Sequence, residues 1–83
     1  KKYTSRVFKQ PLEIVSLIGN ITTLDNEVYL HCHITLGDEE MKAIVGHLKE
    51  GKIAATCEII LAELNGEIDR KHDDFIGLNL LDI

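Results

Sequence analysis

Apolar and polar side chains alternate most regularly in residues 28–36, which contain no glycine or proline. The apolar side chains occupy every second position: Val28, Leu30, Cys32, Ile34 and Leu36. Because side chains point alternately to the two faces of a strand, this pattern predicts a strand with one core face. The opposite face carries His31 and His33, with Cβ atoms roughly 6.5–7 Å apart. Such a pair either shares a metal ion with a third ligand or forms a polar, half-exposed strand face.

Residues 13–21 form a second predicted strand, with apolar side chains on both faces. Gly19 within it indicates a β-bulge or a close approach of another backbone. The segment 24–27 reads Leu-Asp-Asn-Glu, and Asp and Asn both tolerate the left-handed backbone conformation of tight turns. Residues 13–21 and 28–36 are therefore expected to pair as an antiparallel hairpin.

Two interpretations fit residues 38–51. Met41, Ile44, Val45 and Leu48 have the i, i+3, i+4, i+7 spacing of a helix. Asp38 would cap that helix, and a glycine follows its end at position 51. Residues 43–48 also read as a short strand with a bend at a central glycine. Periodicity alone slightly favours the helix.

The longest apolar run, residues 53–64, is predicted to be a strand. Asn65-Gly66 follows it and is the strongest two-residue hairpin signal in the chain, so residues 67–70 are expected to be the return strand. Residues 75–83 are predicted to be a further apolar strand, and residues 3–8 an edge strand. The whole pattern predicts four or five mostly antiparallel strands with at most one helix.

Several of these strands are apolar on both faces, and a sheet this small cannot cover both of its own faces. The 83 residues suffice for a single domain, 1–83, with a thin core. The first residue is Lys1 rather than Met, which suggests that an N-terminal segment is missing. We expect that segment and another subunit to bury the surplus apolar surface.

Charge and cysteine content narrow the functional classes. The net charge is −5, and the basic residues form no run longer than Lys1-Lys2 or Arg70-Lys71, so specific duplex DNA binding by this segment is not expected. Cys32 and Cys57 lie in apolar runs and are expected to be buried, reduced thiols. No apolar run approaches 18 residues and no secretory signal is visible, which favours a cytoplasmic location.

Five blocks of the chain resemble the PPC domain, the plant and prokaryote conserved domain that follows AT-hooks in plants, in its stand-alone prokaryotic form. These blocks are Pro11–Ile21, Leu30–Asp38, Gly46–Gly51, Thr56–Ile60 and Gly77–Ile83. The resemblance implies an α+β fold, a mostly antiparallel sheet with few helices, whose helix lies mainly before the start of this sequence. It also implies a homotrimer and favours an extended conformation for residues 43–48.

The resemblance bears on partners as well. Prokaryotic members are often assigned to DNA binding, whereas plant members contact DNA chiefly through the AT-hook and use this domain to bind protein partners. This chain contains no Arg-Gly-Arg AT-hook core. The implied function is a regulatory-associated module that acts by protein–protein interaction.

Three histidines recur in the resembling family, and His31, His33 and His47 match them here. Three protein ligands with one open position are typical of reactive zinc sites. Zinc is therefore the expected metal, although another first-row divalent ion could occupy the same nitrogens. The alternative function is a zinc-dependent hydrolase or lyase that uses a metal-bound water.

No catalytic residue can be assigned from the sequence. Residues 71–74 are expected to form a polar loop, in which His72 is solvated. Glu58 is expected to form a salt bridge; the alternatives are support of a metal ligand and a role as a base. The acidic run at residues 38–40 is expected to be a solvated turn.

Overall fold

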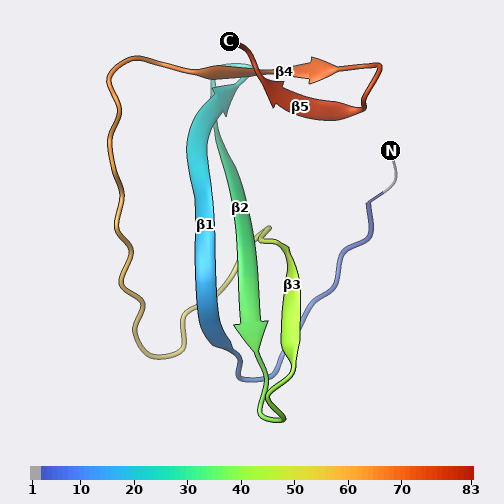
Figure 1. Ribbon diagram of the computed structural model, residues 1–83, viewed down its shortest axis with the longest axis vertical. Coiled ribbons are helices and arrows are strands. Elements are labelled where there is room, and N and C mark those ends of the chain that lie inside the picture. The colour runs from blue at the N-terminus through green and yellow to red at the C-terminus, as the bar shows by residue number, and fades with distance from the viewer. Residues whose placement is uncertain (1–2) are drawn as a thin grey trace.

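The computed structural model describes residues 3–83 and consists of five strands in one mixed sheet (Figure 1). The strands are β1 (Glu13–Leu24), β2 (Glu27–Gly37), β3 (Ala43–His47), β4 (Asp69–Asp73) and β5 (Leu78–Leu81). Their order in the sheet is β3-β2-β1-β4-β5, so the long β1–β2 hairpin lies at the centre. Every neighbouring pair is antiparallel except β1 and β4.

The β1–β2 hairpin confirms the predicted pairing of the two longest strand patterns. Its two-residue turn consists of Asp25 and Asn26, with φ angles of 52° and 65°. Positive φ at both central residues is the geometry that matches the twist of paired strands, and Asp and Asn adopt it at small cost. The turn fixes the register in which Leu24 faces Glu27.

Gly19 lies where the backbones of β1 and β2 approach closely, which is one of the two roles predicted for this glycine. A Cβ atom at this position would overlap the backbone oxygen of His31 and would lie 2.7 Å from the Cα atom of Cys32. The irregularity of β1 lies elsewhere, because the register with β2 shifts between Ile14 and Ser16. Gly19 therefore permits tight pairing beside the histidines.

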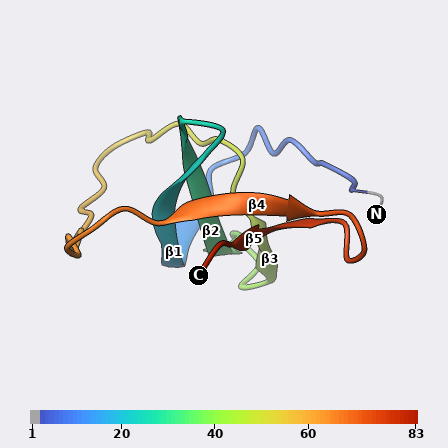
Figure 2. The same cartoon turned by 90° about the horizontal axis from the view of Figure 1, so that it is seen from above.

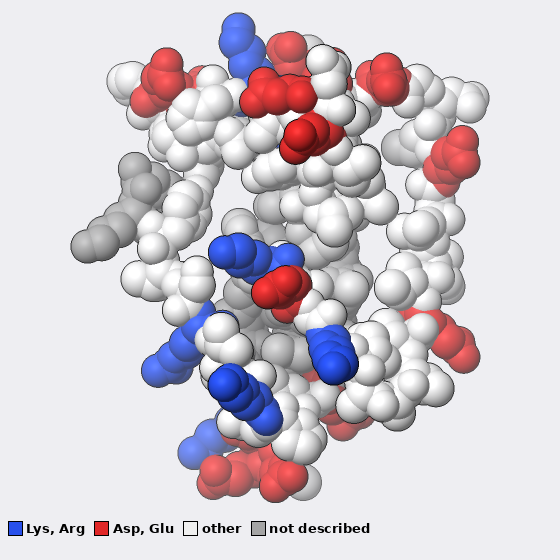
Figure 3. Space-filling view, turned by 180° about the vertical axis from the view of Figure 1, so that it is seen from behind, with Lys and Arg blue, Asp and Glu red and all other residues white. Residues whose placement is uncertain are grey.

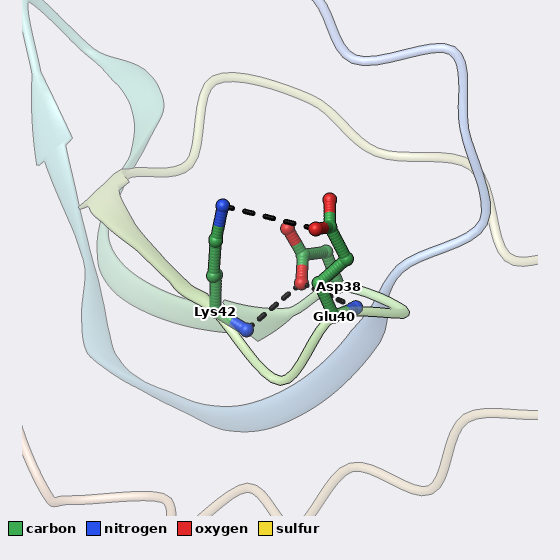
Figure 4. Close-up of polar contacts among 3 residues, drawn as sticks. All are labelled: Asp38, Glu40 and Lys42. Atoms are coloured by element: carbon green, nitrogen blue, oxygen red, sulfur yellow. Dashed lines mark hydrogen bonds and ion pairs between the residues drawn. The ribbon is translucent and has the colours of Figure 1, made fainter.

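Residues 38–47 form a turn and a strand, so the helical interpretation of this segment is wrong. The Asp38 carboxylate accepts hydrogen bonds from the backbone N–H groups of Glu40, at 2.9 Å, and Lys42, at 2.8 Å (Figure 4). The Lys42 ammonium lies 3.9 Å from the Glu40 carboxylate. The turn reverses the chain so that β3 supplies hydrogen bonds along β2, and it includes Met41 at a φ of 65°.

The predicted α+β class is also wrong, because residues 3–83 contain no helix and form an all-β fold. Residues 38–51 are the only stretch with clear helical spacing, and their β-branched centre, Ile44 and Val45, pairs with β2 instead. The free edge of β2 offers backbone hydrogen bonds along five residue pairs, which outweigh a weak helical preference. Within the described chain, therefore, no helix is long and apolar enough to cross a membrane.

Residues 48–68 connect β3 to β4 and form no strand, although the Leu48 N–H donates to the Cys32 carbonyl and the Ile68 carbonyl accepts from the Thr23 N–H. The connection passes behind β2 and β1 in Figure 1 and then runs to the side of β1. The predicted strand over residues 53–64 is therefore wrong for this structure. Asn65-Gly66 does bend the chain, with a φ of 98° at the glycine, but no hairpin forms there. The predicted edge strand over residues 3–8 is absent as well.

Strands β4 and β5 form a small hairpin at the end of the sheet. β4 pairs in parallel with the last residues of β1, where the Thr23 hydroxyl donates a hydrogen bond to the Asp69 carboxylate. The predicted return strand over residues 67–70 covers only the start of β4, which continues into residues expected to form a polar loop. The predicted strand over residues 75–83 is confirmed in its centre by β5.

The sheet is a single layer, as the view from above shows (Figure 2). Among residues 3–83, Ile34 is the one buried hydrophobic residue, with 8 % of its surface exposed. Large apolar side chains remain exposed on β1, on β3 and on the connection, including Val15, Ile18, Val45 and Ile60. The described residues thus leave both sheet faces uncovered, in line with the surplus of apolar side chains in the sequence.

Candidate metal centre

Two neighbouring strands bring three histidines together. His31 and His33 are separated by one residue on β2 and therefore point from the same face. The antiparallel register of β3 places His47 directly opposite His33. The ring centroids lie 5.0 Å apart for His31 and His33, 5.2 Å for His31 and His47, and 4.6 Å for His33 and His47.

The ring nitrogens of these histidines can converge on one ion. One nitrogen from each ring can be chosen such that all three lie within 4.8 Å of one another. Nitrogens around a tetrahedral zinc ion, at about 2.0–2.1 Å from the metal, lie about 3.4 Å apart. Small side-chain rotations would close that difference, so the residues present fit a divalent ion. His33 and His47 are exposed and His31 is half-buried, which leaves one side of the group open.

The surroundings favour the neutral form of His31 that binds metals. Burial lowers the pKa of His31 below its ordinary value of 6.5, and the positive charge of Arg70 and the two other histidines lower it further. No carboxylate is among the groups that shift this pKa. Among residues 3–83, the converging ligand group contains three histidines and no cysteine or acidic residue.

A shallow hollow adjoins the histidines on the side of β1. It is lined by Ile18, Gly19, Asn20, His31 and His33. Ile18 stands opposite His33 and Asn20 stands opposite His31 in the β1–β2 register. The hollow therefore extends from His31 and His33 towards β1.

Arg70 closes the far side of this polar face. Its Nε atom donates to the Thr22 hydroxyl at 2.9 Å, one Nη donates to the Asn79 backbone oxygen at 2.8 Å, and the other donates to the Asn20 side-chain oxygen at 2.9 Å. The guanidinium carbon lies 5.2 Å from the centre of the Tyr29 ring. Residues of β1, β2 and β5 thus hold the guanidinium in one orientation, beside Asn20 in the lining of the hollow.

The sequence identified Arg70 only as part of a short basic pair. Its position depends on the parallel pairing of β4 with β1, which joins residues far apart in the chain and has no local signature. Alternation within β4 would have placed Arg70 and His72 on one face, had residues 69–73 been recognised as a strand.

His72 lies in β4 rather than in a loop, so that part of its prediction is wrong. Its side chain is exposed, as expected, with Nδ1 2.9 Å from Oδ1 of Asn79 and Nε2 3.6 Å from the Asp74 carboxylate. It does not belong to the three-histidine group. Glu58, the other sequence candidate, lies in the exposed connection between β3 and β4 and is not part of the group either.

The two cysteines are free thiols. Cys32 is half-buried opposite Gly19, on the strand face away from its flanking histidines. Cys57 is exposed, so its predicted burial is wrong. Within the described chain, neither thiol joins the histidine group.

A family model, the Plants and Prokaryotes Conserved (PCC) domain, matches residues 1–65, which include all three histidines. The chain belongs to the PCC domain family. This membership confirms the resemblance seen in the sequence blocks. No curated protein matches the chain at a significant level.

One similar solved structure is the crystal structure of a "putative DNA-binding protein" from Bacteroides thetaiotaomicron. It is 31 % identical in sequence to this PCC domain, with a TM-score of 0.69. The similarity covers 90 % of this chain and 54 % of the other. This PCC chain therefore spans about half the length of that protein.

Proposed function

We propose that this PCC domain binds one divalent first-row metal ion, zinc in first place, through His31, His33 and His47. The observation that carries the proposal is the convergence of three imidazole nitrogens within 4.8 Å, delivered by two hydrogen-bonded strands. Imidazole is a preferred ligand of zinc, copper, nickel and iron, so ion availability would decide among them. Bound there, the ion would link β2 to β3 and act as a Lewis acid towards a fourth ligand.

In the wider proposal, the domain acts as a trimeric, regulatory-associated module that binds a protein partner. Support comes from a single-layer sheet with large apolar side chains exposed, such as Val15 at 65 % and Val45 at 72 %. Apolar patches of this kind typically mark surfaces that contact other proteins. The metal site would then stabilise the β2–β3 edge of each subunit.

Direct, sequence-specific reading of duplex DNA is not part of the proposal, although the similar crystal structure carries a DNA-binding description. The net charge of the chain is −5. On the face seen in Figure 3, Lys and Arg side chains gather between the centre and the lower left, and Asp and Glu lie at both ends and along the right edge. Affinity for DNA rests largely on Lys and Arg neutralising phosphates, and the net negative charge of the chain does not favour it.

A zinc-dependent hydrolase or lyase is the second candidate function. The open side of the histidine group favours it, because reactive zinc sites retain one position for substrate or water. Such an enzyme also needs a group that moves protons, and the candidate carboxylate Glu58 does not belong to the histidine group. The binding module is therefore the better supported function.

Calorimetric titration with zinc tests the site through two histidine variants. His33→Ala removes a ligand, and we expect zinc affinity to fall at least about 100-fold, since even loss of a group that supports a ligand costs 10–100-fold. His72→Ala removes an exposed histidine outside the group and should leave zinc affinity unchanged. Equal affinities in the two variants would show that the three-histidine site is wrong.

A further inference from the structure

We propose that the metal site takes a small oxyanion, a carboxylate or a phosphate, held between the metal and Arg70. This inference rests on the proposed metal site. The geometry that carries it is the hydrogen bond from Arg70 to Asn20, a residue that lines the hollow and stands opposite His31. One oxygen of the ligand would occupy the open metal position, and another would accept hydrogen bonds from the guanidinium.

The guanidinium is held rigidly yet retains unused donors. Arginine carries five N–H groups. Three of them donate to Thr22, Asn79 and Asn20, which leaves two without a partner among residues 3–83. The Tyr29 ring lies against the guanidinium and helps to fix its plane. A side chain fixed in this way loses little conformational entropy when it binds a ligand.

The positive charge around the site favours an anionic ligand. Three neutral imidazoles leave the two positive charges of a bound ion uncompensated, and Arg70 adds a third. The ligand group contains no carboxylate among the described residues. An anionic ligand would therefore be attracted both by the bound ion and by Arg70.

A carboxylate that bridges the metal and Arg70 spans only a short distance. Asn20 and His31 are directly opposed on paired strands, so their Cα atoms lie about 4.5–5.5 Å apart. Metal–oxygen bonds of about 2.0–2.2 Å and charge-assisted hydrogen bonds of about 2.7–2.9 Å add to the two-oxygen span of a carboxylate, giving a reach of roughly 7 Å. Larger anions would extend out of the open hollow into solvent.

The walls of the hollow favour a carboxylate over phosphate. Ile18 lines it opposite His33 and offers an apolar contact for the carbon atom next to the carboxyl group. Phosphate offers the same oxygen ligands but has no carbon chain to contact Ile18. Comparing the affinities of the two anions therefore distinguishes them.

The test uses the cobalt-loaded chain, because bound Co²⁺ reports a change of ligand in its visible absorption spectrum. Titration with propionate and, separately, with inorganic phosphate should shift the spectrum, propionate at the lower concentration. In Arg70→Gln, we expect the dissociation constant of the anion to rise at least tenfold while cobalt affinity stays within about threefold. Lys71→Gln is the matched control, because it removes the same charge from the neighbouring residue, on the opposite strand face, and should leave both affinities unchanged.

The outcomes separate the two proposals. If the unmodified chain binds no cobalt, the metal site itself fails. If cobalt binds but Arg70→Gln and Lys71→Gln weaken the anion equally, only the bridging role of Arg70 is overturned. If Arg70→Gln does not fold, Arg70→Lys replaces it: the charge remains but the fork is lost, and unchanged anion affinity in that variant overturns the inference. If phosphate binds more tightly than propionate, and this binding is lost in the Arg70 variants, the site is assigned to phosphate.

Discussion

Gly19 determines how closely β1 approaches the strand that carries His31 and His33. The space beside it is already filled by the backbone of β2, because an added Cβ atom would lie 2.7 Å from the Cα atom of Cys32. The sequence indicated a special role for this glycine, and the structure identifies it as close backbone approach. At Gly46, next to His47, a Cβ atom would meet nothing within 4 Å.

The substitution Gly19→Ala should therefore destabilise the fold. To accommodate the methyl group the paired strands must move apart, and forcing extra volume into a filled site typically costs about 1–3 kcal/mol. Urea unfolding followed by circular dichroism measures the change. Gly46→Ala is the control and should lie within about 1 kcal/mol of the unmodified chain, since its site is open. If Gly19→Ala unfolds at the same urea concentration as Gly46→Ala, the close approach does not limit the fold.

Single residues differ in how far the sequence could predict their roles. His31 and His33 share a strand face by simple alternation, so their proximity follows from the local pattern. His47 was added through the family resemblance, and the register of β3 provides its physical basis. Arg70 could not be predicted, because its contacts with Asn20 and Thr22 depend on the distant pairing of β4 with β1.

At the scale of elements, the conformational preferences of the residues themselves determine the β1–β2 hairpin, but they do not suffice to predict the other elements. The Asp25-Asn26 turn fixes that hairpin with two residues that accept positive φ. Residues 38–47 have both helical and strand patterns, and the unpaired edge of β2 decides between them. Residues 53–64 are the longest apolar run, yet they pair with no strand in the described chain, although β4 occupies the outer edge of β1 only at Thr23 and Leu24.

The turn before β3 is expected to influence the metal site. Asp38 holds this turn through two hydrogen bonds to backbone N–H groups, and β3 then carries His47 to its place (Figure 4). Asp38→Ala should destabilise the fold by about 0.5–2 kcal/mol, as loss of comparable side-chain caps does, and should weaken zinc binding severalfold. Thermal unfolding and zinc titration measure the two effects.

Glu40→Ala provides the control for the turn. The Glu40 carboxylate lies 3.9 Å from the Lys42 ammonium in an exposed pair, and such pairs contribute little. Removing it should leave unfolding and zinc affinity nearly unchanged. Equal losses in Asp38→Ala and Glu40→Ala would show that the carboxylate of Asp38 does not organise the turn.

At the scale of the whole molecule, the exposed apolar surface is the main feature still to be explained. Ile34 is the one buried hydrophobic residue among residues 3–83, whereas Ile18 is 73 % and Ile60 97 % exposed. Burying such side chains contributes roughly 1.5–3 kcal/mol each, so a sheet that leaves them in water has much to gain from association. The sequence pattern predicted this surplus correctly, because it follows from composition and alternation alone.

Light scattering over a range of protein concentrations tests the proposed trimer. The mass should equal three chains at micromolar concentration, since the exposed faces of β1 and β2 would be covered by neighbouring subunits. The mass should also remain at three chains rather than grow, because closed symmetric assemblies are finite. A single-chain mass at micromolar concentration would contradict the trimer.

The most direct test of the central proposal is X-ray absorption spectroscopy at the zinc edge of the zinc-loaded protein. Binding by His31, His33 and His47 predicts nitrogen ligands at about 2.0–2.1 Å, with the multiple-scattering signature of three imidazole rings and no sulfur shell. A sulfur shell at about 2.3 Å would place Cys32 or Cys57 on the metal, and a spectrum without imidazole scattering would place it elsewhere on the surface. Either result would contradict the three-histidine centre.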